Sequence, residues 1–91
     1  MTDDLKPGPP VSGYRSQSDA NIALVNEFKV DEERLLRKID ALMNEVPEST
    51  SAMVTDQFGW LLEARSHIQI GFMALNRAVF QPGRVKLPED E

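Results

Sequence analysis

The sequence has no cysteine and only one histidine among its 91 residues. Without cysteine the chain has no disulfide framework and no thiolate metal site. One histidine with no suitably spaced carboxylates gives no zinc site either, so we expect no metal and no cofactor. No apolar run is long enough to span a bilayer. The opening residues, MTDD, are acidic where a secretory signal would be basic, so we expect no export signal.

Positive charge is also scarce. Ten Lys and Arg face fifteen Asp and Glu, which leaves a net charge of −5. Neutralising the phosphates of a nucleic acid or an anionic membrane needs clustered cations, so we expect no DNA, RNA or membrane partner. A small anion in a local pocket stays compatible with this balance, because it needs only a few cations.

Two segments carry a helical period of apolar residues. In the first, steps of three and four link Ile22, Val25, Phe28, Leu35, Ile39, Leu42 and Val46, with Glu32 at the skipped position and Leu24, Leu36 and Met43 widening the stripe. In the second, the stripe is Phe58, Leu61 or Leu62, Arg65, Ile68, Phe72, Leu75 and Val79. Candidate caps are Ser16, Ser18 and Asp19 for the first helix, and Thr55 and Asp56 for the second. The pattern predicts helices over about 18–46 and 56–80, and no strand.

The short connection makes the two helices antiparallel. We therefore expect an all-α fold, an antiparallel two-helix hairpin over residues 14–83 with a short N-terminal arm or helix. Residues 1–13, rich in proline and glycine, form a flexible arm, and residues 84–91 form a polar tail.

A second face of the second helix also carries apolar and small residues, namely Trp60, Ala64, His67, Gly71, Ala74 and Ala78. Such a face seldom stays bare, and a small hairpin needs a further source of stability. We expect a symmetric homo-oligomer. Coverage of this face by the protein's own arm is the alternative.

The segment GYRSQSD places an aromatic ring and a cation just before the first helix. Tyr14 would stack on a base and Lys29 would neutralise a phosphate. Arg15, Ser12, Ser16 and the helix start would add anion contacts. From residue types alone, the alternative is that Tyr14 holds the arm against the hairpin while Lys29 and Arg15 are solvated charges.

Arg65 falls where the second helix needs an apolar residue, so it needs a partner. Glu33 could pair with it, or cations of symmetric subunits could converge there on an anion. The register of the hairpin places Asn26 opposite Asn76, and a buried Asn pair commonly fixes register. His67 is expected to be packed or interfacial. No nucleophile–base pair or phosphate-binding loop is present, so we expect no enzyme.

Three stretches, GYRSQSD, ALVNEFKVDEERLLRKIDAL and ARSHIQIGFMALNRAVFQP, resemble the phage anti-CBASS type two sponges, helical hairpins grouped with the anti-Thoeris Tad proteins. The resemblance covers roughly residues 13–46 and 60–84. It implies a hexamer that acts in the cytoplasm of the infected bacterium. Such a hexamer binds cyclic dinucleotides, for example 3′,3′-cyclic GMP–AMP, without cleaving them and withholds them from CBASS effectors.

By this resemblance the arm aromatic, Tyr14, stacks on a base and the first-helix lysine, Lys29, meets the phosphates. A second pocket for cyclic trinucleotides would include Arg65, and we add Asn26 to it. Two other functions stay open: a hairpin oligomer that binds a protein partner, and a sponge for cyclic ADP-ribose isomers.

Overall fold

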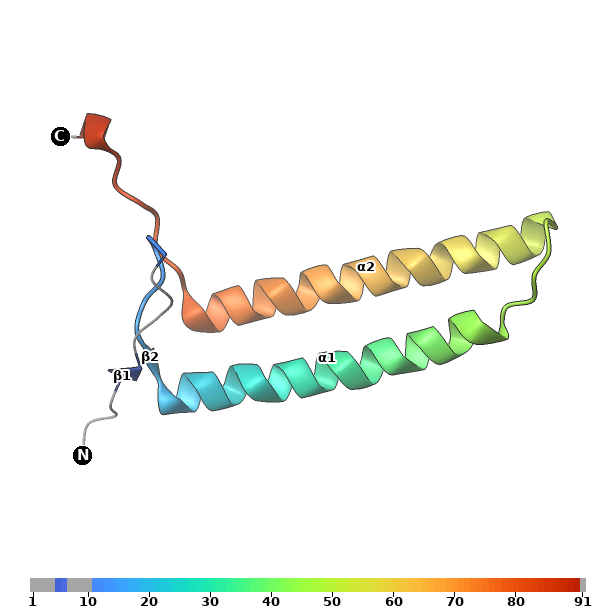
Figure 1. Ribbon diagram of the computed structural model, residues 1–91, viewed down its shortest axis with the longest axis horizontal. Coiled ribbons are helices and arrows are strands. Elements are labelled where there is room, and N and C mark those ends of the chain that lie inside the picture. The colour runs from blue at the N-terminus through green and yellow to red at the C-terminus, as the bar shows by residue number, and fades with distance from the viewer. Residues whose placement is uncertain (1–4, 7–10, 91) are drawn as a thin grey trace.

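The computed structural model describes residues 5–6 and 11–90. Its elements are β1 (Leu5–Lys6), β2 (Gln17–Ser18), α1 (Asp19–Glu45), α2 (Ala52–Phe80) and a short 3-10 turn, η1 (Pro88–Asp90). Figure 1 shows α1 and α2 side by side and antiparallel, with the connecting loop at one end and the described segments before α1 and after α2 at the other. The prediction of two helices that pack against each other is confirmed.

Serine side chains set the start of both helices. Ser18 Oγ accepts a hydrogen bond from the Asn21 amide at 3.1 Å, which selects it among the three candidate caps of α1. Ser51 Oγ accepts from the Val54 amide at 3.3 Å and starts α2 four residues before the predicted boundary. The predicted caps Thr55 and Asp56 were wrong, because both lie inside α2.

At its C-terminal end, α2 is capped by a residue in the left-handed helical conformation. Gln81 has a φ of 43°, and its amide donates to the Arg77 carbonyl at 2.7 Å. Pro82 then prevents the helix from continuing. The predicted end of the second helix is confirmed.

A short β bridge was not predicted. β1 pairs antiparallel with β2, with Leu5 opposite Ser18 and Lys6 opposite Gln17. The backbone is extended at Ser18, ahead of the helix, so its hydrogen-bonding groups are available to a second extended segment. The bridge joins the chain's first described residues to the start of α1.

The seam on α1 agrees with the prediction at Val25 and Ile39, but Leu36, predicted only to widen the stripe, is buried in place of Leu35. Val25, Leu36 and Ile39 are buried, whereas the predicted seam residues Leu35 and Leu42 are 38% and 51% exposed. Leu35 and Leu36 both fit a helical pattern of three- and four-residue steps, so their spacing alone does not show which one faces α2. The crossing of α2 selects the flank that carries Leu36. On α2, Leu61 turns inward and Leu62 outward, and Asn76 takes the inward place predicted for Leu75.

This seam buries little surface. The chain exposes 7493 Å², whereas a compact protein of this mass exposes about 5,300 Å². Its radius of gyration is 19.2 Å, against about 12 Å for a compact domain of this length. On α2, Met53, Trp60, Ile70 and Met73 are each at least 60% exposed. Neither of the two long helices, within the residues described, holds an apolar stretch that could cross a membrane.

The seam register predicts unequal effects of two neighbouring leucines. Leu36→Ala should lower the free energy of unfolding by about 2–5 kcal/mol, because it removes a buried side chain. Leu35→Ala removes the same atoms from an exposed site and should cost clearly less. Urea denaturation of both variants measures the difference. Equal losses would contradict the seam described here.

Candidate functional site

A groove of about 490 Å³ lies at the end of the hairpin where the arm meets both helices. Its lining residues are Tyr14, Val25, Lys29, Ile70, Met73, Ala74, Asn76, Arg77, Phe80 and Pro82. The volume falls within the range of about 300–1,000 Å³ that is typical of ligand pockets. The fold therefore brings Tyr14 and Lys29 to one groove, although the arm's position was not predictable from helical spacing.

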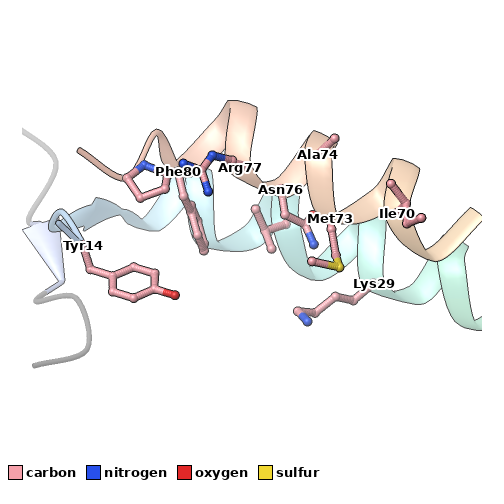
Figure 2. A pocket seen from close by; sticks show the side chains of 10 residues that line it. Tyr14, Lys29, Ile70, Met73, Ala74, Asn76, Arg77 and Phe80 are labelled. Atoms are coloured by element: carbon pink, nitrogen blue, oxygen red, sulfur yellow. The ribbon is translucent and has the colours of Figure 1, made fainter. Parts of the chain in front are cut away.

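Tyr14 stands at the mouth of this groove because the arm turns sharply beside it. Gly13 adopts a φ of 91°, a conformation that favours glycine, and the Tyr14 amide donates to the Val11 carbonyl at 3.2 Å. The Gly83 amide donates to the Gly13 carbonyl at 2.6 Å and fastens the turn to the segment after α2. Figure 2 shows the Tyr14 ring extending along the groove, with its hydroxyl directed toward the end that holds Lys29.

Two cations line the groove. Lys29 comes from α1, and Arg77 comes from the last turn of α2. Neither forms an ion pair with another described residue. Arg77 also stabilises the negative end of the α2 dipole. The groove thus gathers positive charge locally in a chain whose net charge is −5.

The rest of the lining is mostly apolar. Phe80 projects into the groove beside Arg77, and Ile70 and Met73 line the α2 side (Figure 2). Flat aromatic groups bind on such surfaces by stacking and apolar contact. Asn76 supplies an amide between the helices, and its Oδ1 is buried without a hydrogen-bond partner.

The other predicted contacts of the arm do not line this groove. The Arg15 guanidinium lies against Gly83, with Nη2 3.4 Å from where a Cβ of residue 83 would be. Ser12 and Ser16 are exposed, and Ser16 is not the cap of α1. Their contacts with a ligand stay predictions.

Arg65 finds its partner on the other helix. Its Nε donates to Asp40 Oδ1 at 3.1 Å. The suggested partner Glu33 instead accepts from Arg37, one turn along α1, at 2.9 Å. The ion pair explains how a charge fits at the edge of the seam, since both side chains keep access to water.

Asn26 lies elsewhere, in an exposed groove of about 540 Å³ on α1. That groove is lined by Asn26, Lys29, Val30, Glu33, Arg34 and Arg37, and not by Arg65. A single chain therefore does not bring Asn26 and Arg65 together, and a pocket containing both would need a second copy. No side-chain hydrogen bond among the described residues joins Asn26 to Asn76, and Asn76 Oδ1 is left without a partner.

His67 is exposed and lies 3.2 Å from Glu63 on the same helix. It is not packed within this chain. Among residues 5–6 and 11–90, no group of three or more His, Asp or Glu side chains is placed to hold a metal ion.

Several groove residues, above all Arg77 and Phe80, were not predicted from the sequence. A signal for them was present, since Ile70, Met73 and Arg77 follow one another at steps of three and four on one helical face. The sequence did not show where the arm lies, and the arm decides which residues of α2 line the groove. No family model, curated protein or solved structure matches this chain, so the site rests on its own geometry.

Proposed function

We propose that this chain binds cyclic dinucleotides, such as 3′,3′-cyclic GMP–AMP, in the groove between the arm and the helices, and sequesters them without cleavage. The observation that carries the proposal is that Tyr14 and Lys29 line one groove. They come from an irregular arm and from a helix, so this convergence is a property of the tertiary structure.

The chemistry of the lining matches the two parts of such a ligand. The Tyr14 ring and the apolar wall around Phe80 offer flat surfaces to a base. Lys29 and Arg77 offer charge to phosphates, and a cyclic dinucleotide carries two of them. Arginine can donate two parallel hydrogen bonds to one phosphate, whereas lysine acts as a point charge.

Sequestration also fits what the lining contains. Aromatic, apolar and cationic groups hold a nucleotide by stacking and ion pairing, which need no covalent step. Together with the resemblance of three sequence stretches to phage anti-CBASS sponges, this supports a role in withholding the signal from CBASS effectors. The place of action would be the cytoplasm of an infected bacterium.

We further propose that the protein is a symmetric homo-oligomer, a hexamer by the same resemblance. The support is the large accessible surface, about 2,200 Å² above that of a compact protein of this mass. Each partner of a standard interface buries about 800 Å², so an excess of this size is enough for more than one such interface per chain. The exposed α2 residues Met53 and Trp60, which do not line the groove, would supply its apolar centre.

Binding without turnover is tested by calorimetric titration of the protein with 3′,3′-cyclic GMP–AMP. We expect tight binding, and recovery of unaltered nucleotide after heat denaturation of the complex. Recovery of a changed nucleotide would instead reveal an enzyme. Absence of binding would remove this ligand and favour a cyclic ADP-ribose isomer or a protein partner.

Single substitutions separate the contributions of charge and of aromatic stacking to nucleotide binding. Lys29→Ala should abolish measurable binding while the helical content and the oligomer stay intact, and Arg77→Ala should weaken binding and reduce its salt dependence. Tyr14→Ala should cost about 1–3 kcal/mol, the value of one stacking contact. Titrations of each variant measure these losses.

Lys38 provides the matched control for these variants. It is exposed on α1 outside the groove, so Lys38→Ala should change the binding free energy by less than about 0.5 kcal/mol. An equal loss from Lys38→Ala and Lys29→Ala would mean that only the general charge of α1 matters. Dissociation of the Lys29→Ala oligomer would assign Lys29 to assembly.

Assembly is tested by light scattering coupled to size-exclusion chromatography. We expect a mass several times that of one chain. Trp60→Asp should lower it, because the substitution places a charge on the proposed apolar contact. Thr50→Asp adds the same charge in the exposed loop between the helices and should leave the mass unchanged. A monomeric wild-type protein would refute the proposed oligomer.

A further inference from the structure

The arm that carries Tyr14 is joined to the end of α2 by one buried polar side chain, that of Gln17. Gln17 is 9% exposed and is the buried polar residue among those described. Its Nε2 donates to the Phe80 carbonyl at 2.9 Å and to the Arg15 carbonyl at 3.3 Å. Its Oε1 accepts from Asn21 Nδ2 at 3.4 Å.

These contacts link three parts of the molecule. Arg15 directly follows Tyr14 in the arm, Phe80 is a wall of the groove, and Asn21 lies in the first turn of α1. The last carbonyls of a helix have no partner within the helix. Gln17 therefore satisfies a group at the end of α2 and, through the same nitrogen, holds the backbone next to Tyr14.

A second contact constrains the other side of Tyr14. The Gly83 amide donates to the Gly13 carbonyl at 2.6 Å. A Cβ on Gly13 would lie 2.5 Å from the Gly83 carbonyl oxygen, so the two backbones approach each other more closely than a side chain would allow. Tyr14 is thus held from both flanks, by backbone at residue 13 and by the Gln17 side chain through residue 15.

We infer that Gln17 is a positioning residue for the ligand, which holds the Tyr14 ring at the mouth of the groove. The inference rests on the proposed function, since it assigns Gln17 a part in binding a cyclic dinucleotide through Tyr14. Gln17 is not in the groove lining and acts through the arm. Its burial keeps water from competing for the Phe80 carbonyl, so the contact holds the arm in one place before the ligand arrives.

The position of Tyr14 is measured directly in the free protein. Tyr14 is the only tyrosine, so incorporation of 3-fluorotyrosine gives a single ¹⁹F signal from the ring. Gln17→Ala should move and sharpen this signal toward that of a free tyrosine, because the arm loses its attachment. Gln17→Glu should do the same, since it replaces the amide donor by an acceptor that faces two carbonyls. The exposed control Gln57→Ala should leave the signal unchanged.

Ligand binding is then measured by titration with 3′,3′-cyclic GMP–AMP in a double-mutant cycle. Gln17→Ala alone should weaken binding by about 3- to 10-fold, the range expected for one or two lost hydrogen bonds. In the Tyr14→Ala background the same substitution should weaken it by less than about twofold, because the ring that Gln17 holds is absent. A merely structural role would give the same loss in both backgrounds.

An unchanged ¹⁹F signal in Gln17→Ala and Gln17→Glu, or an equal loss of affinity with and without Tyr14, would overturn the inference. Failure of the proposed function has a different signature. In that case the wild-type protein does not bind the nucleotide, while the ¹⁹F spectra of the free variants still report whether Gln17 places the ring.

Discussion

The structure depends on one narrow seam between two long helices. Val25, Leu36 and Ile39 are the buried apolar residues among those described, and in that part of the chain α1 and α2 are the only long elements. Two helices can bury one strip each, so most of their circumference faces water. The consequence is a large exposed apolar surface on α2 and an open end, where the chain before α1 and the chain after α2 meet.

That open end is where the fold creates a site. The arm crosses the end of the hairpin and is held there by Gln17 and by the backbone contact between Gly13 and Gly83. It supplies the aromatic side of a groove whose other walls come from α1 and α2. Because Lys29 and Arg77 face the same space, an acidic protein presents a cationic aromatic pocket at one place only among the grooves described here. The net charge of the chain therefore does not describe the local charge of this groove.

The helices were predictable because their signals are local. The helical spacing of apolar residues, the serine N-caps and the prolines that stop a helix all act within a few residues. The predicted C-terminal ends of both helices agree with the structure. Which of two neighbouring leucines of α1 is buried was less predictable. Leu35 and Leu36 are adjacent on the helix, and only the position of α2 decides which of them faces the seam. The start of α2 was missed because Ser51, Thr55 and Asp56 are all good caps, and the sequence does not rank them.

By itself, the sequence determined a two-helix hairpin with a proline-rich arm, and it indicated Tyr14 and Lys29 as candidate ligand contacts. Only the tertiary structure decided that these two residues share a groove, that Arg77 and Phe80 belong to it, and that Gln17 joins the arm to α2. The physical reason is the distance along the sequence over which each interaction acts. Helix formation is governed by neighbours three and four residues apart, whereas Gln17 and Phe80 are 63 residues apart and meet only when the hairpin has closed.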